Sequence, residues 1–135
     1  MIIGVQMLMD EAVLINDQFY LIGRNDLTDD NRKEVAELVG NFDRTKPIIM
    51  MDHQPKEFTT AEKSGVDLLL LGHIHRGQLA PAHLITSRIF ENDWGYLQKG
   101  TFHSIVSSGF GTWGPPLRIG SRAEVVIIHL SFGKN

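Results

Sequence analysis

The sequence predicts an α/β fold built on a mostly parallel sheet. Two short and nearly continuous apolar runs, Pro47–Met51 and Val66–Leu71, are typical of strands that are buried on both faces of such a sheet. A helix-like stretch that begins at Thr59 or Thr60 and ends at Gly65 separates the two runs. Strands that alternate with helices in this way indicate parallel pairing.

The N-terminal part is expected to form a hairpin and then a helix. Two strand-like segments, 11–16 and 18–23, are joined at Asn16-Asp17, a dipeptide that favours a tight turn. A helix is expected over 30–39, because its apolar residues recur on one side and its charged residues on the other. Gly40 is expected to end that helix.

The C-terminal part is less regular in its pattern. Residues 79–90 predict either a short helix or an extended segment, and strands are expected over 102–107 and 124–130. Between these strands, residues 109–120 contain several glycines and a pair of prolines. Such a segment is too long for a tight turn, so we interpret it as a shaped functional loop.

Three histidines follow the two apolar runs directly. His53 stands after the first run, and His73 and His75 stand one residue apart after the second. Ligands of open parallel sheets gather at the carboxyl ends of the strands, so these side chains are expected to converge. Three neutral imidazoles form a partial coordination sphere for a borderline transition metal, and the sequence therefore indicates a metal site.

Three segments also carry a resemblance to a known family. His53-Gln54-Pro55, the run 72–78 that reads GHIHRGQ, and the run 106–120 that reads VSSGFGTWGPPLRIG resemble the calcineurin-like metallophosphoesterases. The closest likeness is to a bacterial branch whose members often carry membrane segments ahead of the catalytic domain. The resemblance covers nearly the whole chain. It implies a two-sheet αββα sandwich, hydrolysis of phosphate mono- or diesters, and two divalent transition metal ions (Mn, Fe or Zn) in the intact domain.

The family motifs of the first half of that domain are missing here. Members of the family carry Asp-x-His, Gly-Asp and Gly-Asn-His in that order, and the nearest match, Gly40–Asp43, has Phe42 where a histidine is required. We therefore interpret residues 1–135 as a single domain that is the C-terminal part of a catalytic domain. It retains three histidine ligands and lacks the bridging and terminal carboxylates.

The resemblance assigns roles to individual residues. His53 and His73 would bind one metal and His75 the other. Arg118, at the end of the glycine-proline loop, is a candidate catalytic residue that would offer a bidentate fork to a phosphate, with a structural role as the open alternative. Trp113 is a candidate for one wall of the substrate pocket. Arg24 and Asp26 are weaker candidates for residues that line the same cleft.

Composition limits the other functions. The net charge is -3 and no basic cluster accompanies the aromatic residues, so no nucleic-acid surface is expected. The chain has no cysteine, which excludes disulfides and thiolate ligands. No segment reaches the ~18 apolar residues of a spanning helix, so any membrane anchor of the intact parent would lie outside this chain. The compartment stays open.

Two functional hypotheses follow. The first is a metallophosphoesterase, a hydrolase with phosphate-ester substrates, represented by the C-terminal half of its domain. The second is a non-catalytic α/β fragment that binds at most one metal. It would form homo-oligomers through apolar faces and strand edges that the other half would cover.

Overall fold

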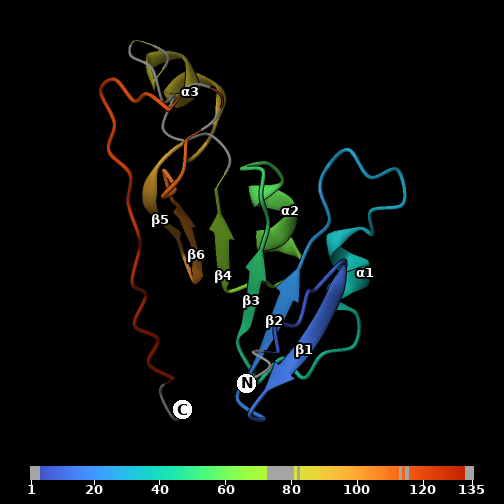
Figure 1. Ribbon diagram of the computed structural model, residues 1–135. Helices are drawn as coiled ribbons and strands as arrows, with labels where there is room; N and C mark the ends of the chain where they lie inside the picture. Colours follow the sequence, from blue (N-terminus) through green and yellow to red (C-terminus); the bar gives the residue numbers. More distant parts are fainter. Residues whose placement is uncertain (1–3, 73–80, 82, 113, 115, 133–135) are drawn as a thin grey trace.

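A single mixed sheet of six strands organises the chain (Figure 1). The computed structural model describes residues 4–72, 81, 83–112, 114 and 116–132, of which 83 and 86 are described by their backbone alone. The strands are β1 (Glu11–Ile15), β2 (Phe19–Gly23), β3 (Ile48–Met51), β4 (Leu68–Leu71), β5 (Gly95–Lys99) and β6 (Phe102–Val106). They lie in the order β1-β2-β3-β4-β6-β5.

The four central strands run parallel. β2 pairs with β3, β3 with β4 and β4 with β6 in parallel registers, whereas β1 and β5 are antiparallel edge strands. The predicted α/β class with a mostly parallel sheet is confirmed. Parallel pairing also places the carboxyl ends of β2, β3, β4 and β6 at one edge of the sheet.

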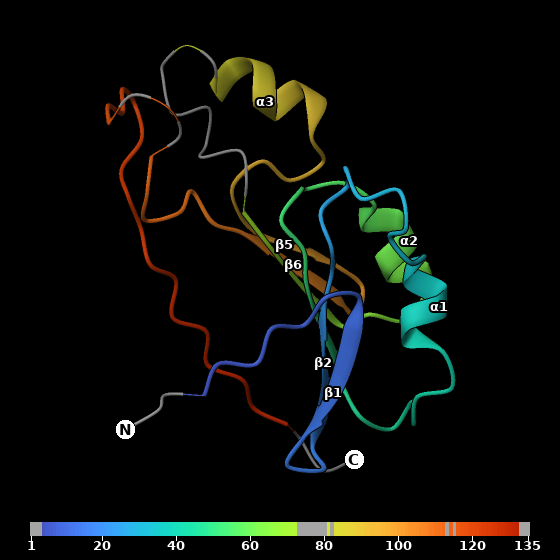
Figure 2. The same cartoon turned by 45° about the vertical axis from the view of Figure 1, so that its right-hand side comes forward.

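Two helices cover one face of this sheet (Figure 2). They are α1 (Val35–Val39) and α2 (Phe58–Lys63), and α3 (His83–Ile89) lies beyond the carboxyl ends of the strands. The core between sheet and helices consists of Ile22, Val35, Leu38, Val39, Ile48, Met50, Phe58, Ala61, Val66, Leu69, Leu71, Phe102 and Val106. Burial of this apolar surface is the main stabilising term of the fold.

The predicted hairpin is confirmed, and its turn has the expected backbone. Asn16 and Asp17 have φ angles of 47° and 58°, the left-handed values that a tight turn with two central residues requires. The amide of Gln18 donates to the carbonyl of Ile15 at 2.8 Å and closes the turn. Short polar side chains tolerate this backbone region better than β-branched ones.

The helix predicted over 30–39 is shorter than expected, because α1 covers only Val35–Val39. The amide of Lys33 donates to a carboxylate oxygen of Asp10 at 2.9 Å. That contact holds the chain in an irregular loop instead of a first helical turn. Gly40 ends the helix as predicted, at a positive φ of 44° that favours glycine.

Three other expectations are confirmed. α2 occupies the segment assigned to a helix before Gly65, α3 realises the helical alternative for 79–90, and β6 lies within 102–107. β5 was not predicted. It is a short edge strand with polar residues, and its pairing with β6 is decided by tertiary contacts that the local pattern does not contain.

The strand predicted over 124–130 is wrong. These residues form no strand, and Val125 and Ile127 are 77% and 78% exposed. Figure 2 shows this segment, coloured orange to red, on the side of the sheet opposite α1 and α2. A strand needs hydrogen bonds to the open edge of another strand, and residues 124–130 pair with neither edge strand of the described sheet, β1 or β5.

Shortening a side chain should destabilise the protein much more in the core than in the exposed segment 124–130. Met50 is 1% exposed, so Met50→Ala is expected to lower the free energy of unfolding by about 2 to 5 kcal/mol. Val125→Ala, the control, is expected to change it by less than about 0.5 kcal/mol. Chemical denaturation measures both. A comparable loss in the Val125 variant would mean that 124–130 is packed in solution.

Candidate metal and phosphate site

Of the three predicted metal ligands, His53 is the one that the structure describes, and it follows β3 at the carboxyl edge of the parallel strands. The amide of Asp52, just after β3, donates to the carbonyl of Leu70 at 2.9 Å, and the amide of Gly72 donates to the carbonyl of His53 at 3.3 Å. On the other side of β4, the amide of Ser107 donates to the carbonyl of Leu71 at 3.0 Å. Three loops therefore leave the sheet side by side.

His53 is exposed at this edge. A Cβ placed on Gly72 would lie 3.8 Å from its Nδ1 atom, so the imidazole lies beside the residue that precedes His73. His73 and His75 are outside the described residues, and the convergence of the three imidazoles stays a prediction.

The loop of His53 is held on one side by Asp26, an exposed residue of the loop after β2. The amide of Thr28 at 2.9 Å, the hydroxyl of Thr28 at 2.8 Å and the side-chain amide of Gln54 all donate to the Asp26 carboxylate. These hydrogen bonds, led by those from Thr28, lower the pKa of Asp26 from 3.8 to about 2, against a small opposing effect of burial. His53 adds an electrostatic contribution of the same sign.

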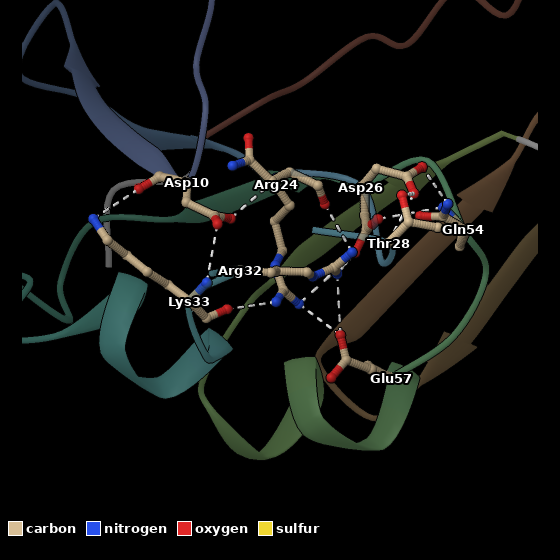
Figure 3. A network of polar contacts seen from close by, with 10 residues as sticks. Asp10, Arg24, Asp26, Thr28, Arg32, Lys33, Gln54 and Glu57 are labelled. Carbon is tan, nitrogen blue, oxygen red and sulfur yellow. Dashed lines mark hydrogen bonds and ion pairs between the residues drawn. The ribbon is translucent and has the colours of Figure 1, made fainter. Parts of the chain in front are cut away.

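A second set of contacts forms the charge cluster, which consists of Arg24, Arg32, Asp52 and Glu57. Figure 3 shows Arg24, Arg32 and Glu57 of this cluster. Nη1 of Arg24 donates to Glu57 Oε2 at 2.7 Å, and Nη2 of Arg32 donates to both Asp52 and Glu57. The side chains of Arg24, Arg32 and Asp52 are only 2%, 7% and 4% exposed. Arg24 is therefore buried in ion pairs and does not line an open cleft with Asp26.

Arg118 ties the glycine-proline loop together. Its Nη2 atom donates to the carbonyls of Ser108 at 2.9 Å, Gly109 at 3.0 Å and Gly111, and its Nη1 atom donates to the carbonyl of Arg122 at 3.3 Å. These contacts favour the structural alternative for this residue. The phosphate contact stays a prediction, and Trp113 lies outside the described residues.

Sequence reasoning missed a second acidic residue at the same edge, Glu124. Its carboxylate accepts from the amide of Ser108 at 2.6 Å, from the indole N–H of Trp94 at 3.0 Å and from the hydroxyl of Ser107 at 3.3 Å. Burial raises its pKa, but the hydrogen bonds from Ser108 and Trp94 outweigh burial and lower it overall. Glu124 lines a cavity of about 420 Å³ together with Trp94 and Ser108.

A metal ion in a protein is normally held by several His, Asp or Glu side chains that meet at one point. Within the described ranges, which leave out His73 and His75, no three His, Asp or Glu side chains come together as a ligand group. His53 by itself fits the role of one ligand, because an exposed imidazole at the carboxyl edge can reach a cation. The described residues thus supply one of the three predicted ligands.

Comparison with known proteins gives several relatives, most of which carry metallophosphoesterase in their names. The chain is 38% identical over 134 residues to an uncharacterized metallophosphoesterase of Aquifex aeolicus. The aligned region covers 93% of this chain and 50% of that relative. The chain is 39% identical over 99 residues to an uncharacterized metallophosphoesterase of Helicobacter pylori J99, covering 72% of this chain and 27% of the relative. A transmembrane protein with metallophosphoesterase domain from Danio rerio is 35% identical over 88 residues, covering 62% and 20%.

These similarities establish the family: the chain belongs to the metallophosphoesterases. Its mixed α/β sheet is consistent with a calcineurin-like fold. No family model and no solved structure matches the chain. The chain spans half the length of the Aquifex relative and about a quarter of the Helicobacter one. Among the described residues, no helix is both long and apolar enough to cross a membrane.

The hydrogen bonds of Asp26 predict a specific pH dependence. Its pKa is depressed in the folded state, so its contribution to stability is complete above pH 3.8 and is lost as the pH falls toward about 2. Asp26→Asn should therefore lower the free energy of unfolding at pH 7, and the difference from wild type should shrink over that interval. Denaturant unfolding at several pH values measures this.

Removal of the Thr28 hydroxyl, the strongest side-chain donor to Asp26, provides the matched control. Thr28→Val should return the pKa of Asp26 toward 3.8, as measured by NMR titration of the carboxyl carbon. An Asp26 pKa that does not respond to loss of the Thr28 hydroxyl would contradict this account of the loop.

Proposed function

We propose that this chain is the C-terminal part of a metal-dependent phosphoesterase that hydrolyses phosphate mono- or diesters at a dinuclear centre. The observation that carries the proposal is the position of His53, exposed after β3 and beside Gly72, the residue before His73. The lengths of the relatives support the view that further ligands come from a part of the domain that this chain does not contain.

In this proposal His53 and His73 hold one divalent metal ion and His75 the other. The ions would be Mn, Fe or Zn, which accept imidazole ligands. When bound, such a pair supplies a nucleophile from metal-bound water and neutralises charge on the phosphoryl oxygens. The chain's own contribution is to hold the imidazoles at the carboxyl edge, with Asp26 and Gln54 fixing the backbone next to His53.

Metal binding tests the assignment of the ligands. The 135-residue chain is expected to bind at most one Mn²⁺ or Zn²⁺ per molecule, because it lacks the bridging carboxylate. His53→Ala and His73→Ala should abolish that binding, whereas His129→Ala, an exposed histidine outside the motifs, should not. Elemental analysis after dialysis and calorimetric titration give the stoichiometry. Two tightly bound ions per chain would show that the chain completes the site itself.

Catalysis tests the role of Arg118. In a domain reconstituted by adding the missing part in trans, Arg118→Ala should weaken binding of an aryl phosphate by ~1.5 to 3 kcal/mol if the guanidinium contacts phosphate. Arg122→Ala, an exposed arginine nearby in the loop, is the control. If turnover is unchanged and only thermal stability falls, Arg118 acts through the carbonyls that it already contacts.

The second candidate function is a non-catalytic fragment that binds at most one metal and self-associates. Exposed apolar residues on the segments 5–9 and 125–132 favour it, among them Val5 at 76%, Met7 at 72% and Ile127 at 78% exposure. Large exposed apolar areas mark interaction surfaces. In the phosphoesterase reading the same residues pack against the rest of the domain.

Self-association of the isolated chain is expected for both candidate functions. In both, the exposed apolar residues of segments 5–9 and 125–132 are not covered by any other part of the 135-residue chain. Light scattering at increasing concentration should show a mass above 15.2 kDa. Replacement of Val125 and Ile127 by Thr should move the protein toward the monomer. Turnover of an aryl phosphate with added Mn²⁺ then separates the two functions, and a monomer at all concentrations would contradict the exposed surface.

A further inference from the structure

The charge cluster links two loops at the carboxyl ends of the strands. Each arginine connects the loop that follows β2 to the loop that follows β3. Nη2 of Arg24 donates to the carbonyl of Lys33 at 2.7 Å, and Nη1 of Arg32 donates to the carbonyl of Asn25 at 2.8 Å. The remaining Nη contacts go to the carboxylates of Asp52 and Glu57. With these contacts and little exposure, neither guanidinium is available to a phosphate in solution.

These contacts enclose His53 along the chain. Asp52 precedes it and accepts from Arg32, and Gln54 follows it and donates to Asp26. Both neighbours are therefore fixed by side-chain contacts, while the His53 carbonyl accepts from Gly72. The exposed imidazole projects from a backbone that is anchored on each side.

Glu57 shows that the anchoring opposes a conformational preference. It has φ 60° and ψ 23°, a left-handed conformation that costs free energy for a residue other than glycine. Its carboxylate receives hydrogen bonds from Arg24 at 2.7 Å and Arg32 at 3.1 Å. The loop 52–57 is thus held in a shape that its own backbone does not favour.

Stability alone is a poor explanation for such a cluster. Desolvation of buried ions offsets most of their attraction, and well-packed apolar residues in their place are often equally stable. Ion pairs with fixed geometry do, however, hold the groups that they join in one arrangement. In metal sites, replacement of a residue that orients a ligand typically weakens metal affinity or activity by about 10- to 100-fold.

We propose that Arg24 and Arg32 are positioning residues that, through Asp52 and Glu57, fix the loop 52–57 and so the direction of the His53 imidazole. The inference rests on the proposed function for His53 as a metal ligand. The backbone part of it, that the cluster holds the loop rigid, is independent of any metal.

The first measurement uses the metal-free chain. In Arg32→Met, which keeps the length of the side chain and removes its charge, the NMR order parameter of the His53 amide should fall from about 0.85 to below about 0.6. Arg44→Met is the matched control, since Arg44 donates to the carbonyl of Ser64 at 2.8 Å, away from this loop. It should leave His53 rigid. A rigid His53 amide in the folded Arg32 variant would overturn the proposal.

The second measurement is Zn²⁺ affinity, by calorimetric titration well below the melting temperature. Arg32→Met should weaken binding about 10- to 100-fold, Arg32→Lys should weaken it less, and Arg44→Met should leave it unchanged. Loss of thermal stability with unchanged affinity would mean a purely structural role and would overturn the proposal.

Two further variants keep the outcomes distinct. If His53→Ala binds Zn²⁺ as wild type does, the proposed metal site fails, while the order parameter still decides whether the cluster holds the loop. If Arg32→Met does not fold, Glu57→Gln replaces it, because that side chain is 31% exposed and the change keeps its shape. It should also lower the His53 order parameter, and an unchanged value would overturn the proposal.

Discussion

Parallel pairing of β3, β4 and β6 is the constraint on which the rest of the structure depends. Parallel strands end at the same edge, so the loops after Met51, Leu71 and Val106 leave the sheet together. Backbone hydrogen bonds such as that from Gly72 to His53 continue the pairing beyond the strands. Under the proposed function, ligands from distant parts of the chain would meet in one place, and the loops at this edge would supply part of it.

The loop after β3 divides its two neighbouring side chains between different environments. Asp52 lies within the charge cluster and His53 faces outward, in keeping with the alternation of side chains along an extended chain. The buried side is held by ion pairs with little exposure, and the exposed side keeps its imidazole accessible. The same short loop therefore combines rigidity with an accessible ligand, which is what a preorganised metal site requires.

The two faces of the sheet are unequal. α1 and α2 bury one face in a continuous core, whereas the other face lies opposite the segment that contains Ile128, Leu130 and Phe132, with a cavity of about 430 Å³ between them. Residues 124–130 have the composition of a strand but pair with neither edge strand of the described sheet. The Aquifex and Helicobacter relatives are at least twice as long as the part aligned with this chain.

The sequence by itself determined the α/β class, the hairpin turn at Asn16-Asp17 and the metallophosphoesterase family, because apolar runs, turn residues and the histidine motifs are local signals. Only the tertiary structure decided the length of α1, the pairing of β5, the fate of 124–130 and the burial of Arg24. Each of these depends on tertiary contacts made or not made: Asp10 with Lys33, β5 with β6, Arg24 with Glu57, and the lack of pairing between 124–130 and β1 or β5. Local patterns carry no information on such contacts, since they form only when the folded chain brings the partners together.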